Sequence, residues 1–285
     1  MFPCTSLDRL LPLAFEEDVN TGDITSLATI PDSSVSIAHL TTKSDGCIAG
    51  LPVISRIFEF KTYSGVYCGL VEEGQWVKAG TNIFKIETGT RNILECERIL
   101  LNFLQRLCGI ATQSHIFQKA VSHTKIKILD SRKTLPGFRE LDKYAVRTGG
   151  ASNHRMGLYD AVLIKDNHIQ ACGKVRDAVD IIHKAYGDKY IIETEVETNH
   201  ELETLAGSKV NWIMLDNMAK KDMASAVAFI RREIPNAKIE LSGNMSLAKI
   251  TEVADLDVDY ISVGALTHSV EAMDISLNFI ETSHK

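Results

Sequence analysis

The sequence lacks a long hydrophobic run. The apolar stretch nearest the N-terminus, residues 10–15 (LLPLAF), follows Asp8 and is itself followed by Glu16, Glu17 and Asp18. A signal peptide needs a longer apolar core with a basic flank, and a membrane helix needs about 20 apolar residues. We therefore expect a cytoplasmic protein without a membrane partner.

Cysteine pairs with the spacing of a metal or redox motif are also missing. The chain has six cysteines, and no two of them are separated by two residues only. Reduced cysteines without such spacing are most often buried and inert. The sequence thus argues against disulfides and a structural zinc site, and it predicts that most of the thiols are free and buried.

An excess of positive charge is absent, because the formal net charge is −6. This balance argues against a broad nucleic-acid surface. One stretch, residues 132–165, departs from it with seven basic and three acidic residues. The basic members are Arg132, Lys133, Arg139, Lys143, Arg147, Arg155 and Lys165. Such a cluster in an acidic chain indicates a small polyanion held locally, although a solvated helix face has a similar composition.

Segments of low complexity are missing as well, and 285 residues with 45% hydrophobic content can bury a full core. Up to residue 121 the chain indicates a mixed α/β region. Helices are predicted over residues 7–17, 52–60 and 92–121, strands over 35–40, 65–71 and 84–86, and a loop over 17–25. Gly109 predicts a break in the longest helix or a close contact with it. Arg98 and Arg106 lie on that helix, where a plain surface charge is the simplest interpretation.

After Lys125 the pattern alternates between strands and helices, which predicts a parallel sheet covered by helices. The strands are expected at 126–131, 161–165, 190–196, 212–216, 238–243 and 260–265, and the helices at 174–186, 199–206, 219–233 and 246–254. The regular repetition favours a barrel over an open sheet. A complete β/α barrel takes about 250 residues, and 160 follow Lys125. We therefore expect an incomplete barrel of six or seven strands, whose open side needs cover from another subunit or domain.

Polar residues stand at the end of each predicted strand. They are Ser131-Arg132-Lys133, Lys165-Asp166-Asn167, Glu195, Asp216-Asn217, Ser242-Gly243-Asn244 and Gly264-Ala265. In a β/α barrel the carboxyl ends of all strands face one mouth, and the active site is built there. We therefore expect these residues to converge.

The convergent set contains complementary groups. Arginine and lysine (Arg132, Lys133, Arg155, Lys165), with His154, match carboxylates and phosphates. Glu195 and Asp216 suit Mg²⁺ or sugar hydroxyls, and the glycine turns after the last two strands suit a phosphate. A phosphate, a cation with hydroxyls and a carboxylated second substrate together indicate phosphoribosyl transfer to a carboxylated base, in which positioning and charge stabilisation provide the catalysis.

Each member of the set also has a structural explanation. Glu195 stands on a strand that also bears other carboxylates, and Asp216-Asn217 is a possible helix cap. Ser242-Gly243 is a common turn, and His154 is a possible hydrogen-bonded core histidine. Only the shared placement at strand ends favours the functional interpretation.

The residues resemble the quinolinate phosphoribosyltransferase family nearly from end to end. The motifs are Gly22-Asp23-Ile24-Thr25, Glu97-Arg98, Arg132-Lys133-Thr134, Asn153-His154-Arg155, Ile164-Lys165-Asp166-Asn167-His168, Glu193-Thr194-Glu195-Val196-Glu197, Leu215-Asp216-Asn217, Ser242-Gly243 and Ser262-Val263-Gly264-Ala265. Asn244 stands where the family has a second glycine. Asparagine tolerates a left-handed backbone, so the loop can keep its shape.

The resemblance implies an N-terminal α/β sandwich domain, residues 1–112 joined by 268–285, and an incomplete α/β barrel, residues 113–267. It also implies a homodimer whose sites lie at the interface, with Arg98 reaching the neighbouring site. This role reverses the interpretation of Arg98 as a plain surface charge.

The resemblance further assigns roles to the site residues. The two carboxylates of quinolinate are expected on Arg132, Arg155, His154 and the neighbouring subunit's Arg98. Lys133, beside Thr134, and Lys165 would serve the pyrophosphate and the charge that develops near the pyridine. Glu195 and Asp216 would bind ribose hydroxyls and the Mg²⁺ region. The 5′-phosphate would be held by Ser242, Gly243, Asn244, Val263, Gly264 and Ala265.

The implied reaction joins quinolinate to phosphoribosyl pyrophosphate and releases CO₂ and pyrophosphate, on the route to NAD. Three rivals remain open. A transferase of the same fold would prefer another base such as nicotinate, a Schiff-base barrel would use Lys165 covalently, and a non-catalytic nucleotide or nucleic-acid binder would use the basic cluster alone.

Overall fold

A computed structural model describes residues 2–283. Its residue contacts divide the chain into two compact units. The first unit contains the described residues up to His115, the segment Thr134–Gly150 and those from Leu266 onward. The second unit contains Ile116–Lys133 and Ala151–Ala265. The sequence places Thr134–Gly150 in the barrel domain, residues 113–267, whereas the structure places this segment in the first unit.

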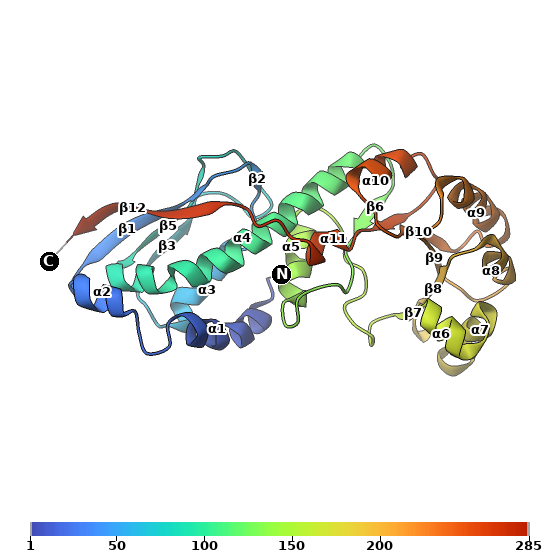
Figure 1. Cartoon of the computed structure of the whole chain (residues 1–285), viewed down its shortest axis with the longest axis horizontal. Coiled ribbons are helices and arrows are strands. Elements are labelled where there is room, and N and C mark those ends of the chain that lie inside the picture. Colours follow the sequence, from blue (N-terminus) through green and yellow to red (C-terminus); the bar gives the residue numbers. More distant parts are fainter. Residues whose placement is uncertain (1, 284–285) are drawn as a thin grey trace. The chain divides into compact units, whose positions relative to one another are not determined.

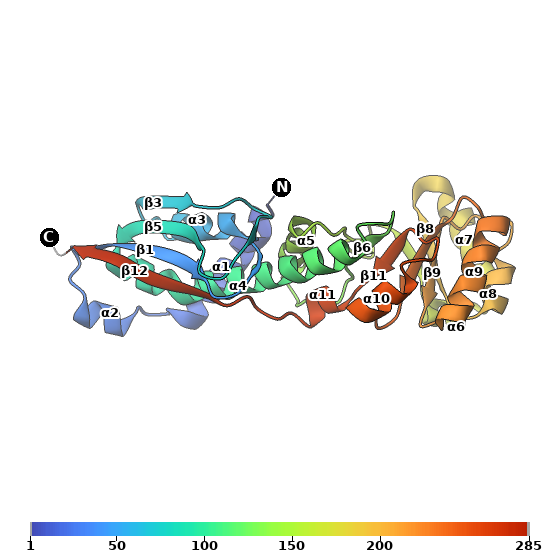
Figure 2. The same cartoon turned by 90° about the horizontal axis from the view of Figure 1, so that it is seen from above.

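The first unit is built on a four-stranded antiparallel sheet in the order β12-β1-β5-β3. Its strands are β1 (Val35–Thr42), β3 (Gly65–Gly69), β5 (Asn82–Gly89) and β12 (Ile275–Ser283), and a small sheet pairs β2 (Gly46–Cys47) with β4 (Trp76–Val77). Alternate residues of β1 are buried, and helix α3 (Leu51–Phe60) and the first part of α4 (Thr90–Ala120) lie against one face of the sheet (Figures 1 and 2). Strand β12 was not predicted as a strand, and it pairs with β1 from Val35 to Thr42.

Three helices of this unit follow the predicted apolar stripes, and three more, α2, α5 and α11, were not predicted. They are α1 (Cys4–Asp18), α2 (Ile24–Thr29), α3 (Leu51–Phe60), α4 (Thr90–Ala120), α5 (Arg139–Thr148) and α11 (Ala265–His268). A loop was expected where α2 begins, but the Asp23 carboxylate accepts hydrogen bonds from the backbone N–H groups of Thr25 and Ser26 and caps a helix there. Helix α4 continues through Gly109, where a Cβ would lie 2.1 Å from the carbonyl oxygen of Glu271. This glycine therefore marks a close contact, not a break.

The second unit is a parallel sheet in the order β6-β11-β10-β9-β8-β7. The strands are β6 (Lys127–Leu129), β7 (Val162–Ile164), β8 (Ile192–Val196), β9 (Trp212–Asp216), β10 (Lys238–Ser242) and β11 (Tyr260–Ser262). The helices are α6 (Asp166–Cys172), α7 (Val175–Tyr186), α8 (Asn199–Thr204), α9 (Lys220–Glu233) and α10 (Leu247–Val253), with a 3₁₀ turn, η1, at Gly187–Lys189. Most lie along the outer side of the strands (Figure 1).

This sheet curves back on itself. Ser152 forms a parallel bridge with Leu129 of β6 and so adds a short extended segment beside that strand. Strand β8 lies four places from β6 in the strand order, which is about 19 Å in a flat sheet. Yet His154, two residues beyond the bridge, has its Nε2 atom 3.1 Å from the carboxylate of Glu193 on β8. The curved sheet confirms the expected incomplete α/β barrel.

Two expectations from composition can be compared with the structure. All six cysteines are free, but only Cys47, Cys96 and Cys108 are buried, so the prediction that most thiols are buried was wrong. Within residues 2–283, none of the helices combines the length and the apolar character that a membrane span requires.

Candidate active site

The predicted site residues of the second unit gather at one end of the parallel sheet. Lys165 follows β7, Glu195 lies near the end of β8, and Asp216 ends β9. Asp216 is paired in register with Ser242, the last residue of β10. Because the strands are parallel, their carboxyl ends form one edge, where barrel enzymes place their active sites.

Lys165 and Glu195 form an ion pair at this edge. The Lys165 ammonium lies 2.6 Å from Oε1 of Glu195, and the two side chains are 45% and 11% exposed. Solvent screens an ion pair at this exposure, so it adds little to stability. The ion pair instead fixes the position of the lysine, because the carboxylate holds the ammonium group near the strand ends. An anion that binds there would compete with Glu195 for Lys165.

The turns after β9 and β10 interlock. Asn217 has a left-handed backbone (φ 54°), its amide donates to the Asp216 carboxylate at 2.8 Å, and its backbone N–H donates to the carbonyl of Ser242 at 3.2 Å. A Cβ on Gly243 would lie 2.3 Å from Oδ1 of Asn217. Helix α9 begins later, with Ala219 at its N-cap and no side-chain cap bond. The helix-cap interpretation of Asp216-Asn217 was therefore wrong.

The loop after β10 has the conformation expected from its sequence. Gly243 and Asn244 are both left-handed, with φ of 99° and 47°. The Lys249 ammonium donates to the carbonyl of Gly243 at 2.8 Å and adds a positive charge that the motifs did not reveal. In the neighbouring loop, Val263 is buried and its N–H donates to the carbonyl of Leu129 at 2.8 Å. Gly264 and Ala265 are the next residues of that loop.

Arg155 is a buried arginine with another arginine nearby. One guanidinium N–H of Arg155 donates to the carbonyl of Ala161 at 2.9 Å, and the residue is 8% exposed. Burial and then the charge of Arg132 lower the pKa of Arg155, against the opposing effects of nearby carboxylates. Its Nε–H is buried without a hydrogen-bond partner among residues 2–283. A buried donor beside a second positive charge is the arrangement that an anionic ligand completes.

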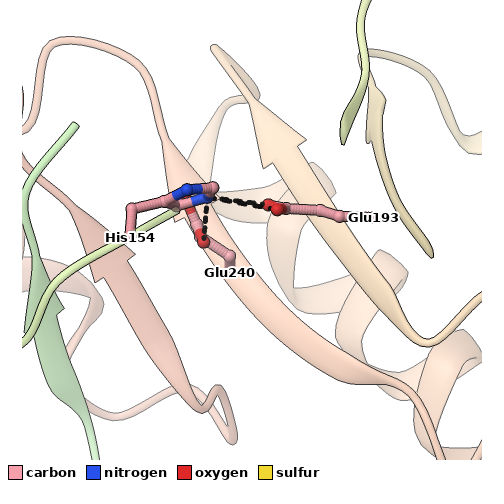
Figure 3. A group of neighbouring side chains, drawn as sticks. All are labelled: His154, Glu193 and Glu240. Atoms are coloured by element: carbon pink, nitrogen blue, oxygen red, sulfur yellow. Dashed lines mark hydrogen bonds and ion pairs between the residues drawn. The ribbon is translucent and has the colours of Figure 1, made fainter. Parts of the chain in front are cut away.

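His154 lies among buried carboxylates (Figure 3). Its Nε2 atom is 3.1 Å and 3.2 Å from the two carboxylate oxygens of Glu193 and 3.7 Å from one of Glu240. Burial, followed by the charge of Glu193, raises the pKa of Glu240, which is fully buried. Asp130 accepts the backbone N–H of His154 at 2.8 Å and also bonds the amide of Asn153. The interpretation of His154 as a hydrogen-bonded core histidine agrees with these contacts.

The sequence motifs did not predict roles for Asp130 or Glu240. Asp130 directly follows β6, and it fixes the backbone that carries His154. Glu240 lies two residues before the end of β10, at the same side of the strand as Ser242. For Glu240 the sequence did contain a signal, because polar residues recur at every second position of this strand and so lie on the same side.

Acidic residues line a hollow beyond β7 and β8. Its volume is about 290 Å³, and its lining residues are Asp166, Ile169, Gln170, Glu195, Glu197 and Glu201. A free anion would be repelled there, whereas sugar hydroxyls or a hard cation bound to phosphate match carboxylate oxygens. Of the two residues predicted near magnesium, Glu195 lines this hollow and Asp216 does not, and one oxygen of Glu195 is bonded to Lys165.

Two predicted site residues, Arg98 and Thr134, belong to the first unit. Arg98 is exposed on α4, and Thr134 accepts a hydrogen bond from the Arg139 guanidinium at 3.2 Å. Arg106, which lies on α4 like Arg98, corrects an expectation. The sequence favours a plain surface charge at Arg106, but its guanidinium donates two hydrogen bonds, at 2.9 Å and 2.7 Å, to the fully buried Asp142 carboxylate.

A curved parallel sheet with arginines, a lysine–glutamate pair and left-handed turns at the carboxyl ends of its strands defines a β/α-barrel enzyme for anionic substrates. Comparison with known proteins narrows this class. Residues 23–108 match the family model of the quinolinate phosphoribosyl transferase N-terminal domain, and residues 110–278 match that of its C-terminal domain. The chain belongs to the quinolinate phosphoribosyltransferase family.

Individual relatives agree. The probable nicotinate-nucleotide pyrophosphorylase [carboxylating] of Bacillus subtilis is 38% identical over 272 residues, which cover 95% of this chain and 93% of the relative. The corresponding protein of Mycobacterium leprae is 40% identical, with 93% and 94% covered. The crystal structure of NadC from Streptococcus pyogenes superposes with a TM-score of 0.91 at 35% identity and covers 99% of each chain.

Proposed function

We propose that the protein transfers the phosphoribosyl group of phosphoribosyl pyrophosphate to quinolinate and releases pyrophosphate and CO₂, giving nicotinate mononucleotide for NAD biosynthesis. The observation that carries this proposal is Arg155, a buried arginine with Arg132 nearby and with an Nε–H that has no hydrogen-bond partner within the described chain. Two arginines so arranged match a substrate with adjacent carboxylates.

Arg132 and Arg155 bind the carboxylates in this proposal, and Arg98 of a second subunit completes the grip. Each charge-assisted hydrogen bond contributes about 1.5–3 kcal/mol, so the set favours a dicarboxylate over a monocarboxylate. A homodimer is part of the proposal, because Arg98 is exposed in the first unit and a role in binding requires another surface against it.

The ribose and pyrophosphate are assigned to Glu195, Asp216, Lys133 and Lys165. Mg²⁺ would be bound mainly through the pyrophosphate, near Glu195 and Asp216, and would offset the charge of the leaving group. The lysine–glutamate pair favours this assignment, because an arriving phosphate competes for Lys165 and frees the Glu195 carboxylate for hydroxyls. We assign the 5′-phosphate to the turn of Ser242, Gly243 and Asn244 and to Gly264 and Ala265.

Catalysis then proceeds in two stages. The pyridine nitrogen of quinolinate attacks C1 of the ribose while the C1–O bond to pyrophosphate breaks, through an oxocarbenium-like transition state. The bond between C2 of the ring and its carboxylate then breaks, CO₂ leaves, and the electron pair remains on C2 next to the positively charged nitrogen until a proton replaces it. Lys165 and the arginines stabilise the developing charges by position, and no covalent enzyme intermediate forms.

The test is an assay for nicotinate mononucleotide and CO₂ from quinolinate, phosphoribosyl pyrophosphate and Mg²⁺. We expect both products in equal amounts and no turnover when the divalent cation is chelated. A preference for nicotinate as the acceptor would replace the proposal with a related transferase. A borohydride-trapped adduct on Lys165 would replace it with Schiff-base chemistry. Cell fractionation tests the expected cytoplasmic location.

A further inference from the structure

Lys249 contacts the turn after β10, and the proposed function gives this lysine no role. Its ammonium donates to the carbonyl oxygen of Gly243 at 2.8 Å, and the residue is half-buried. Its backbone N–H donates to the hydroxyl of Ser246, the N-cap of α10, at 3.2 Å. The helix dipole disfavours a positive charge in the first turn of a helix, so the stability of α10 does not explain a lysine at this position.

The bond from Lys249 determines the orientation of one peptide group. The peptide bonds of the described residues are all trans, and in a trans peptide the C=O and N–H bonds point in opposite directions. Because the carbonyl of Gly243 is held by Lys249, the N–H of Asn244 in the same peptide points away from the lysine. This N–H donates to no other group within residues 2–283, and Asn244 is exposed, so the N–H is free to bind a ligand.

The backbone of Asn244 favours the opposite orientation of this peptide. A flip rotates the ψ angle of Gly243 and the φ angle of Asn244, and glycine tolerates either state because it has no Cβ. Asn244 now has a left-handed φ of 47°. A flip would move its φ to about −130°, in the extended region that L-residues prefer. Without another contact, the flipped peptide would therefore be the more stable one.

The two sides of this peptide are fixed by other contacts. The carbonyl of Ser242 accepts the backbone N–H of Asn217 at 3.2 Å, and the side chain of Met245 is buried. A flip is therefore confined to the peptide between Gly243 and Asn244. It would place a carbonyl oxygen where the N–H now lies, and a phosphate binds an N–H but is repelled by an oxygen.

We propose that Lys249 is a positioning residue for the 5′-phosphate. It holds the carbonyl of Gly243, opposes the preference of Asn244 for the flipped peptide, and so keeps the N–H of Asn244 directed at the phosphate. A glycine at position 244 would have no such preference, so the need for the lysine depends on the asparagine. The inference rests on the proposed function, which assigns the 5′-phosphate of the ribose to this turn.

The test is a double-mutant cycle on the whole protein, read as the Kd for ribose 5-phosphate by titration calorimetry. Lys249→Met keeps the length of the side chain without its charge, and the Kd should rise about tenfold because most peptides would flip. Asn244→Gly alone should leave the Kd unchanged. In the double variant the two orientations are about equally stable, so the Kd should rise only about twofold.

Three further variants control for charge and folding. Lys249→Arg keeps a donor for the carbonyl and should bind ribose 5-phosphate almost as well as wild type, whereas Lys249→Ala should repeat the result of Lys249→Met. The matched control is Lys220→Met, because the ammonium of Lys220 also donates to a backbone carbonyl of α10, that of Glu252 in the last turn. Its Kd should equal that of wild type. In steady-state kinetics the KM for phosphoribosyl pyrophosphate should follow these Kd values, while the KM for quinolinate and kcat stay close to wild type.

Two results would overturn the inference while the proposed function stands. An unchanged Kd in Lys249→Met would show that the lysine contact is only structural. A loss that Asn244→Gly does not relieve would show that the lysine acts on the phosphate through its charge and not through the peptide. A wild-type protein that does not bind ribose 5-phosphate would also contradict it. If the cycle gives the expected values but no nicotinate mononucleotide forms, the proposed function fails and the role of Lys249 at a phosphate site remains.

Discussion

The two ends of the parallel sheet differ in how their charges are paired. At the amino ends of the strands, Asp259 precedes β11 and accepts hydrogen bonds from Arg231 at 2.8 Å, from Lys238 at 3.0 Å and from the backbone N–H of Ile239 at 3.0 Å. Asp257 extends this network to Arg231 and to Lys125. Positive and negative groups alternate, and none of the carboxylates named here is left without a cation.

At the carboxyl ends, like charges lie near one another. Arg132 lowers the pKa of Arg155 after the larger effect of burial, and three left-handed residues (Asn217, Gly243 and Asn244) form the adjoining turns. Such features cost stability and persist at sites where a ligand supplies the missing partner. Paired charges therefore stabilise this unit at the amino ends of its strands, whereas neighbouring arginines at the carboxyl ends match an anionic ligand.

The largest expected effect is on activity at the carboxyl ends. Arg132→Ala and Lys165→Ala each remove a charge from the proposed site, and loss of one charge-assisted contact lowers kcat/KM by about 10- to 100-fold or more. Thermal unfolding should remain close to wild type, because removal of Arg132 also relieves repulsion of Arg155. Steady-state kinetics and calorimetry measure the two quantities. Arg232→Ala, on the exposed side of α9, is the matched control and should be fully active. Near wild-type turnover in both site variants would refute the site.

The next prediction tests whether the site is shared between two subunits or lies within one chain. Arg98→Ala and Lys165→Ala subunits are each expected to have strongly reduced activity alone. If Arg98 acts in the neighbouring site, a mixed dimer contains one intact site, and random mixing restores about a quarter of the sites. The measurement is activity after co-refolding, with heterodimers verified by two affinity tags. Absence of rescue in verified heterodimers would place Arg98 outside the site.

The parallel sheet could be predicted from the sequence because its signals are local. Strands such as β9 (Trp212–Asp216) and β10 (Lys238–Ser242) are short apolar runs that end in polar residues, and each is followed by a helical stripe. Parallel topology then requires the ends to share one edge. By contrast, β12 (Ile275–Ser283) is recognisable only through its pairing with β1, because six of its nine residues are exposed and its apolar pattern is weak.

The missed features of the site depend on contacts between distant segments. His154 contacts the Glu193 carboxylate, 39 residues away, and the N–H of its neighbour Arg155, and neither contact can be seen in the order of the residues. Arg106 resembles any surface arginine until Asp142, 36 residues away, is seen buried beneath it. Residue type and spacing identify which groups can carry charge, but tertiary contacts decide how each charge is paired.

A smaller effect is expected at the amino ends, on stability alone. Burial raises the pKa of Asp259, but the hydrogen bonds from Arg231, Ile239 and Lys238 outweigh it and hold the pKa below its ordinary value. A carboxyl group with a lowered pKa in the folded protein stabilises above its unfolded-state pKa and loses this contribution as the pH falls. Asp259→Asn should therefore lower the free energy of unfolding by about 1–3 kcal/mol near neutral pH.

The difference between wild type and Asp259→Asn should shrink in denaturant titrations below about pH 4, while kcat/KM stays at the wild-type value. Asp255→Asn, whose side chain is 69% exposed and paired with Lys220 at 3.4 Å, is the matched control and should change little. A stability difference that grows towards acid pH would have the wrong sign for this network.

The smallest effect is expected at Asn244, in the turn at the carboxyl ends. Its backbone is left-handed (φ 47°), whereas the neighbouring Gly243 faces Asn217 so closely that a Cβ would lie 2.3 Å from its Oδ1 atom. Asn244→Gly removes a strained side chain but frees the unfolded backbone, so the two terms offset each other to within about 0.5 kcal/mol. Activity with phosphoribosyl pyrophosphate should be unchanged.

Gly243→Ala, one residue earlier, should instead raise the KM for that substrate and lower the unfolding temperature, because Asn217 must move. If both substitutions were silent, the interlocked turns would not shape the phosphate site, and its binding would have to be sought in the loop of Gly264 alone.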